Sequence, residues 1–356
     1  MSIRDLLSAT LDQEASDLHL SPGQVAKVRI DGDIVDLNEK VLESDDIAEI
    51  FKEITTSHQQ QQFSKSLELD FSFALAAKSR FRVNAYMTNI GIALAFRPIP
   101  NRIPTLEQIQ APKILRTLTE APRGLILVTG PTGSGKSTTL AAMINHINHN
   151  RRMHILTIED PVEFEHQSDF SLVNQRELNQ STLSFENALR AAMREDPDII
   201  LIGEMRDLET IRLALTAAET GHLVFATLHT TGAAKTIDRV VGVFPGPEKD
   251  LIRIMLSESL LAVVSQILVK KASGHGRVAA REIMLNSPAI RNLIRENKIA
   301  QMQSAIQTSA AQGMISLDQS LSRLVEEGLI SGKEAEGNGA AYATSSGSKT
   351  RGGENG

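Results

Sequence analysis

The chain has 356 residues, of which 41% are hydrophobic and 22% are charged, with a formal net charge of −6. This length predicts two or three domains with separate cores. The absence of cysteine excludes disulfides, cysteine zinc sites and cysteine nucleophiles, and the acidic balance disfavours a nucleic-acid partner. No apolar run approaches the roughly 18 residues that span a bilayer. The first residues lack a secretory pattern, so we expect a cytoplasmic protein without direct membrane insertion.

Residues 1–100 predict a small α+β domain. Thr88-Asn-Ile-Gly91 is a hairpin signal between two strand-like runs. Three prolines, at positions 98, 100 and 104, then mark a linker that we place at residues 101–112. The predicted elements are helices at residues 2–13 and 44–65 and strands at residues 17–20, 25–30, 79–87 and 92–97.

Two arginines, Arg82 and Arg97, flank this hairpin nearly symmetrically. If the loop has two residues, the arginines are directly opposite each other, and like charges there are destabilising unless an anion lies between them. One interpretation is two solvated arginines in a register shifted by one residue. The other is a pair of arginine fingers that meet the phosphates of a nucleotide, on a neighbouring subunit. The spacing alone does not decide between them.

From about residue 113, strands alternate with helices, which predicts an α/β domain with a mostly parallel sheet covered on both faces. We place this core at residues 113–275, a mainly helical region at 276–332 and a disordered Gly/Ser-rich tail at 333–356. The predicted strands are residues 124–129, 154–159, 198–203 and 223–228, and the predicted helices are 137–149, 185–194, 207–220 and 248–265.

A phosphate-binding loop of the form GxxxxGK[ST] separates the first of these strands from its helix. Glycines let successive N–H groups point inward, and the helix N-terminus adds partial positive charge. Lys136 would reach the outer phosphates of a nucleoside triphosphate and Ser137 would bind Mg²⁺. A chance match has a probability of about 1% in a chain of this length. The predicted phosphate-binding residues are Gly130, Pro131, Thr132, Gly133, Ser134, Gly135, Lys136, Ser137 and Thr138.

Acidic residues follow two of the buried strands. Glu159-Asp160 and Glu163 follow one, and Glu204 follows another. Open α/β sheets bind ligands at the carboxyl edge of the strands, where the phosphate loop also lies. Carboxylates there would hold Mg²⁺ or orient water for hydrolysis.

Two histidines flank the strand at 223–228. Their separation of seven places His222 and His229 on opposite faces of an ideal strand. His229 is the better site candidate because it lies at the carboxyl end, whereas His222 more plausibly orders a turn or a subunit contact.

Four motifs in this order resemble the GspE/PilB/PilT family of secretion ATPases, the motors of type IV pili and type II secretion. They are the phosphate loop, the acidic box at residues 158–164, the segment 194–207 and the histidine box at 220–230. The resemblance covers about residues 3–332. Residues 289–296, Ala-Ile-Arg-Asn-Leu-Ile-Arg-Glu, look like the signature of the retraction ATPases. Extension motors usually have a four-cysteine zinc motif and a further N-terminal domain, so the retraction type fits better.

This resemblance implies a RecA-like P-loop ATPase domain preceded by a PAS-like domain, with ATP bound between the two, in a homohexameric ring. ATP and Mg²⁺ would be the cofactors. Glu204 would activate the attacking water, Glu163 would help to hold Mg²⁺ and water, and His229 would sense the phosphate. Glu204 would also contact the metal, partly through water. Arg82 and Arg97 match the arginine positions of the family.

By the same resemblance, hydrolysis would drive pilus retraction, and hence twitching motility, through an inner-membrane platform protein (PilC-like), with a PilU-like paralogue as a further partner. The motor would be cytoplasmic and peripheral at the inner-membrane base of the pilus. Three alternatives are an extension or type II secretion ATPase, a nucleic-acid-translocating RecA-like ring and a nucleotide-switched scaffold. The low aromatic content of 4% disfavours the second, and the intact acidic residues disfavour the third.

Overall fold

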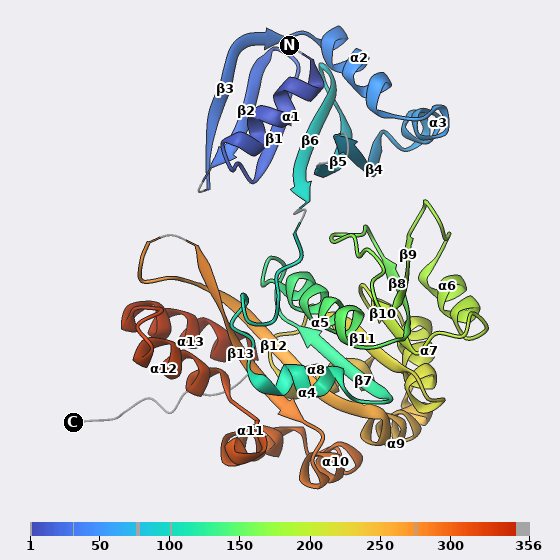
Figure 1. Ribbon diagram of the computed structural model, residues 1–356, viewed down its shortest axis with the longest axis vertical. Helices are drawn as coiled ribbons and strands as arrows, with labels where there is room; N and C mark the ends of the chain where they lie inside the picture. Colours follow the sequence, from blue (N-terminus) through green and yellow to red (C-terminus); the bar gives the residue numbers. More distant parts are fainter. Residues whose placement is uncertain (1, 31, 76–78, 100–101, 275, 347–356) are drawn as a thin grey trace. The chain divides into compact units, whose positions relative to one another are not determined.

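The computed structural model describes residues 2–30, 32–75, 79–99, 102–274 and 276–346 (Figure 1). The chain folds as two units, Met1–Arg102 and Ile103–Gly356. The predicted first domain ends at residue 100, two residues before this division.

The first unit contains a six-stranded antiparallel sheet with the strand order β3-β2-β1-β6-β5-β4. The predicted elements do not include β3 or β4. Most β3 residues are exposed and show no apolar alternation, whereas β4 does alternate polar and apolar residues and was missed. Its elements are α1 (Ile3–Asp12), β1 (Asp17–Leu20), β2 (Gln24–Ile30), β3 (Asp33–Leu42), α2 (Ser44–Ile54), α3 (Ser57–Ser66), β4 (Glu68–Leu75), β5 (Ser79–Thr88) and β6 (Gly91–Ile99).

Helix caps and a small core define this unit. The predicted helix at residues 44–65 is wrong in one respect, because it is two helices. Thr56 begins the second of them by accepting a hydrogen bond from the Gln59 backbone N–H in a capping box. Phe81 and Phe96 are fully buried and pack edge to face, with ring centroids 6.5 Å apart. The hairpin that contains Arg82 and Arg97 therefore rests on a packed aromatic pair.

The second unit contains a seven-stranded sheet with the order β13-β12-β7-β11-β10-β8-β9. All neighbouring pairs are parallel except β12 and β13, which confirms the predicted mostly parallel sheet. Its elements are α4 (Lys113–Thr119), β7 (Gly124–Thr129), α5 (Lys136–Asn150), β8 (His154–Glu159), β9 (Leu172–Glu177), α6 (Phe185–Ala192), β10 (Ile199–Ile202), α7 (Leu208–Glu219), β11 (Leu223–Leu228), α8 (Ala233–Gly242), η2 (Gly246–Glu248), α9 (Lys249–Ser259), β12 (Leu260–Lys270), β13 (Arg277–Leu285), α10 (Pro288–Arg295), α11 (Ile299–Thr308), η3 (Ala310–Gln312), α12 (Leu317–Glu326) and α13 (Gly332–Ser346).

Strand β7 shows how both faces of this sheet are covered. Leu125 and Leu127 pack in a core with residues of α6 to α11, whereas Ile126 and Val128 pack in a second core with residues of α4 and α5. Every residue of β7 is buried. This burial explains why the strand is a continuous apolar run rather than an alternating one.

Two sequence predictions for the end of this unit are wrong. The predicted helix at residues 248–265 ends at Ser259, and Leu260 begins β12, which pairs with β7. A buried strand and a buried helix segment have the same apolar content, so periodicity does not separate them here. The predicted boundary at residue 275 also cuts the β12–β13 hairpin, and the helical region begins at Pro288.

The predicted disordered tail is wrong for its first part, because residues 332–346 form α13. Figure 1 shows α12 and α13 beside the β12–β13 end of the sheet. Buried Tyr342 packs there with Val269, Ala280 and residues of α12. This burial offsets the low helix propensity of the glycines in α13. Residues 347–356 lie outside the described residues, and none of the helices that are described is long and apolar enough to cross a membrane.

Candidate active site

The phosphate loop connects β7 to α5, at the carboxyl edge of the sheet. Gly130 has a φ of 139°, and a Cβ there would lie 2.2 Å from the Gln266 carbonyl oxygen and 2.7 Å from Ser134 Oγ. Only glycine fits this close approach. The loop geometry therefore depends on β12 as well as on the loop sequence.

Gln266 on β12 holds the loop and was missed by the sequence analysis. Its Nε2 donates to the Ser134 carbonyl oxygen at 2.7 Å, and its Oε1 accepts from Thr139 Oγ1 at 2.9 Å. The side chain is fully buried. The signal in the sequence is a polar residue inside the apolar run 260–269. The predicted helix at residues 248–265 covers most of that run, so the strand and its buried glutamine were not predicted.

Lys136 is buried at the start of α5, and its Nζ donates to the carbonyl oxygens of Gly130 at 2.9 Å and Pro131 at 3.1 Å. Burial lowers the pKa of this lysine, and the charges of Glu204 and Glu163 oppose that effect. The amine therefore lies inside the cradle formed by the loop, with both predicted carboxylates close enough to act on it.

Glu204, His229 and Lys136 form one chain of contacts. His229 Nε2 lies 3.1 Å from Glu204 Oε1, and His229 Nδ1 lies 3.4 Å from Lys136 Nζ and 3.5 Å from Thr132 Oγ1. An imidazole with its proton on Nε2 fits these contacts, because Nε2 then donates to the carboxylate and the single lone pair of Nδ1 faces the lysine and the threonine. Three residues that the sequence placed at separate strand ends thus meet at the phosphate loop.

His222 lies at the opposite end of β11, and its Nδ1 donates to the Ala217 carbonyl oxygen at 2.9 Å. It orders the turn between α7 and β11.

The acidic segment after β8 places Glu159 and Glu163 differently. Glu159 shares a cavity of about 40 Å³ with Ser137, and its Oε1 accepts from Thr157 Oγ1 at 2.7 Å and Gln175 Nε2 at 3.1 Å. Burial raises the pKa of Glu159 to about 7, although both hydrogen bonds lower it. Glu163 is exposed. Glu159 is therefore the carboxylate that shares a cavity with Ser137, a position that the sequence did not single out.

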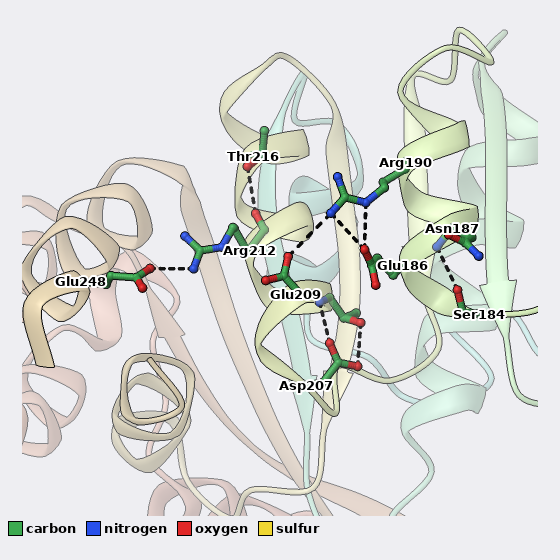
Figure 2. Close-up of polar contacts among 10 residues, drawn as sticks. Ser184, Glu186, Asn187, Arg190, Asp207, Glu209, Arg212, Thr216 and Glu248 are labelled. Carbon is green, nitrogen blue, oxygen red and sulfur yellow. Dashed lines mark hydrogen bonds and ion pairs between the residues drawn. The ribbon is translucent and has the colours of Figure 1, made fainter. Parts of the chain in front are cut away.

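Asp207 and α6 hold the helix that follows Glu204. Asp207 begins α7 by accepting from the Thr210 backbone N–H at 2.8 Å. Figure 2 shows Arg190 of α6 between Glu186, at 3.0 Å, and Glu209 of α7, at 3.8 Å. These exposed pairs contribute little each, so the cap is the main local determinant of where α7 starts.

A second cavity, of about 420 Å³, adjoins the other side of the phosphate loop. Gly135, Thr138 and Arg277 are among the residues that line it. Arg281 also lines it and donates to the carbonyl oxygens of Gln110 at 3.3 Å and Ile109 at 3.2 Å. Burial lowers the pKa of Arg281 to about 10, which leaves it charged at neutral pH. The segment before α4 is thus fixed beside the start of α5.

In the first unit, Arg82 and Arg97 are cross-strand partners on β5 and β6. Arg97 Nη2 lies 2.8 Å from Asp17 Oδ1, and Arg82 Nε lies 3.9 Å from Asp70 Oδ1. The four side chains line a cavity of about 270 Å³. The shifted register is therefore wrong, and the anions beside the two arginines are aspartates of the same unit.

A mostly parallel sheet with a GxxxxGK[ST] loop, a buried lysine and convergent carboxylates defines a P-loop nucleotide-hydrolase fold. A family model described as "Type II/IV secretion system protein" matches residues 1–321. The chain belongs to this family of secretion ATPases.

Individual relatives agree with the family match. The type IV pilus retraction ATPase PilT of Pseudomonas aeruginosa is 57% identical over 335 residues, which is 94% of this chain and 97% of the relative. A twitching motility protein of Neisseria gonorrhoeae is 58% identical over 86% of this chain and 82% of its own length. The crystal structure of the pilus retraction motor PilT with bound ADP superposes with a TM-score of 0.87 and 44% identity, over 94% of this chain and 96% of the other.

Proposed function

We propose that this protein is a motor ATPase that hydrolyses ATP to power retraction of a type IV pilus. The observation that supports this most directly is the chain of contacts from Glu204 through His229 to Lys136 at the phosphate loop. It lies in a protein that is similar over nearly its whole length to a pilus retraction ATPase.

In this proposal, the N–H groups of residues 130–138 and Lys136 bind the phosphates. The cavity beside Gly135 and Thr138 is large enough for the nucleoside, with Arg277 at its edge. Glu204 orients or deprotonates the attacking water, and His229 senses the outer phosphate through its contact with Lys136.

Mg²⁺ would be held by Ser137 with Glu163 and Glu204, partly through water, and the cavity beside Ser137 adds Glu159. Within the described ranges, no group of three or more His, Asp or Glu side chains is placed to hold a metal by itself. Mg²⁺ usually keeps several waters and binds one or two protein ligands together with substrate phosphates. The metal would neutralise charge on the phosphates.

The assembly we propose is a homohexamer in which Arg82 and Arg97 meet the nucleotide as arginine fingers, in the same or a neighbouring subunit. Its partners would be an inner-membrane platform protein (PilC-like) and a PilU-like paralogue. The motor would be cytoplasmic, at the inner-membrane base of the pilus, with residues 1–100 as a PAS-like domain and the remainder as the ATPase domain and helical region.

Deletion of the gene in the source organism tests this function. We expect hyperpiliated cells that do not twitch, restored by the wild-type gene and not by a Glu204→Gln copy. A Glu209→Gln copy, altered in a half-buried carboxylate of the neighbouring helix, is the matched control. Bald cells would instead identify an extension motor, and the loss of a secreted enzyme with normal twitching would identify a secretion ATPase.

A further inference from the structure

The N-terminus of α8 lies three residues beyond His229, and side chains of the central sheet bind its N–H groups. Gly232, at the N-cap, has no side chain to cap its own helix. Its N–H donates to Ser265 Oγ at 2.9 Å, and the Ala233 N–H donates to Glu282 Oε1 at 2.7 Å. Ser265 and Glu282 are cross-strand partners on β12 and β13. The sheet thus supplies the cap that the local sequence lacks.

The C-terminal helix α13 completes this network through Tyr342. Its hydroxyl oxygen lies 3.1 Å from Ser265 Oγ and also has a side-chain hydrogen bond with Glu282. Gln303 of α11 donates to the second oxygen of Glu282 at 3.2 Å. Burial raises the pKa of Tyr342, so the hydroxyl keeps its proton. A residue near the end of the chain therefore contacts both side chains that cap α8.

The turn between β11 and α8 has further contacts that limit its movement. Thr230 Oγ1 lies 2.7 Å from Thr236 Oγ1, and Thr236 Oγ1 donates to the Gly232 carbonyl oxygen at 2.8 Å. His229 is therefore held between the end of β11 on one side and the cap at Gly232 on the other. A shift of the cap would move the imidazole relative to Glu204, which it contacts at 3.1 Å.

We propose that Tyr342 is a positioning residue for ATP hydrolysis. It acts through Ser265 and the Gly232 N–H to hold His229 within contact distance of Glu204 and Lys136. This inference rests on the proposed ATPase function. It assigns α13 a part in turnover, because the helix supplies a contact to the turn that contains a site residue. Since Tyr342 touches neither the phosphate loop nor Glu204, its effect is on the rate of turnover rather than on nucleotide affinity.

The test compares the full chain with its Tyr342→Phe variant, which keeps the ring and removes the hydroxyl. Loss of the hydrogen bonds to Ser265 and Glu282 predicts a fall in kcat of about fivefold or more, with the KM for ATP within about twofold of wild type because ground-state binding is unchanged. The stoichiometry of MgADP binding reports the folded, competent fraction. Tyr86→Phe, at the only other tyrosine of the chain, is the matched control and leaves kcat unchanged.

Two double variants separate positioning from simple stabilisation. In a Ser265→Ala background, Tyr342→Phe should lower kcat by a smaller factor than in the wild-type protein, because only the contact with Glu282 is left to lose. In a His229→Ala background it should leave residual hydrolysis unchanged. An unaltered kcat in the single variant overturns the inference, and so does an equal fold loss in the His229→Ala background. Ser265→Ala removes the other partner of the same contact, on the central sheet. It tests the inference independently if Tyr342→Phe lowers the folded fraction. A wild-type protein without ATPase activity would overturn the proposed function instead.

Discussion

Arg97 and Asp17 form a two-point contact, in which Arg97 Nε and Nη2 lie 2.9 and 2.8 Å from the same carboxylate oxygen. The Arg97 side chain is 67% exposed, whereas that of Asp17 is 13% exposed. The aspartate is thus largely buried in the sheet, while most of the arginine side chain is exposed and can meet a second anion. Because the arginine of this pair is exposed to solvent, the pair contributes little to stability.

We therefore expect Arg97→Ala to leave the thermal unfolding midpoint nearly unchanged and to lower kcat by about 10³-fold or more, as removal of an arginine finger does. Steady-state ATPase kinetics and thermal unfolding of the full chain measure both quantities. Arg80→Ala, two residues before Arg82 on the same face of β5, is the control. A kcat within about twofold of wild type would exclude Arg97 from the reaction.

Mixing experiments reveal which subunit receives the arginine. Arg97→Ala and Glu204→Gln subunits, each inactive alone, should regain part of the activity when mixed if the arginine acts on a neighbouring site. No recovery with verified mixed assembly would place the arginine in the same subunit as the nucleotide that it contacts.

Glu204→Gln keeps the size of the side chain and removes the base. We expect it to lower kcat by roughly 10²–10⁴-fold, the usual contribution of a general base, while MgADP affinity stays near the wild-type value. Isothermal titration and single-turnover hydrolysis separate binding from chemistry. Glu209→Gln should behave as wild type, and normal turnover in Glu204→Gln would remove Glu204 from the catalytic role.

Gln266→Leu tests the link between β12 and the phosphate loop. The substitution leaves the Ser134 carbonyl oxygen and the Thr139 hydroxyl without their buried partner, which costs about 1–3 kcal/mol for each such group. We expect lower unfolding free energy and weaker MgADP binding, since the loop is no longer held. Exposed Gln301→Leu is the control. Unchanged MgADP affinity in the Gln266 variant would show that the loop is held without this contact.

His166 predicts a pH dependence of stability. Burial, with a smaller contribution from the charge of His149, lowers the pKa of His166 from 6.5 to about 4. Between these values the unfolded chain binds more protons than the folded one, so this contribution is fully present above pH 6.5 and is lost as the pH falls toward 4. The loss is at most about 1.4 kcal/mol per pH unit.

Urea unfolding of wild type and His166→Gln across this range measures the effect. The wild-type unfolding free energy should fall more steeply with decreasing pH than that of the variant, which lacks the titrating group. Parallel pH profiles for the two proteins would show that protonation of His166 does not lower the unfolding free energy.

Some predictions succeeded because their causes are local in the chain. The strand–glycine–helix pattern around residues 130–137 predicts a phosphate cradle from local backbone geometry. The hairpin turn at Thr88–Gly91 was also predicted, but the register that brings Arg82 opposite Arg97 was left open by the spacing and is given by the structure. The parallel sheet followed from the alternation of apolar runs with helical segments.

The wrong predictions concern segments whose structure is set by contacts with residues far away in the sequence. Residues 260–264 are an apolar run that suits a helix or a strand, and pairing with β7, more than a hundred residues earlier, makes them a strand. Gln266 was missed for the same reason. Its role exists only once β12 lies beside the phosphate loop.

Sequence by itself determined the phosphate loop, the order of the motifs and hence the family, because these depend on neighbouring residues. Only the tertiary structure decided that Glu204, His229 and Lys136 touch, that Asp17 pairs with Arg97, and that Tyr342 reaches the cap of α8. The physical reason is that such contacts arise when separate strands pair and their ends meet at one edge. No local pattern along the chain specifies how those side chains face one another.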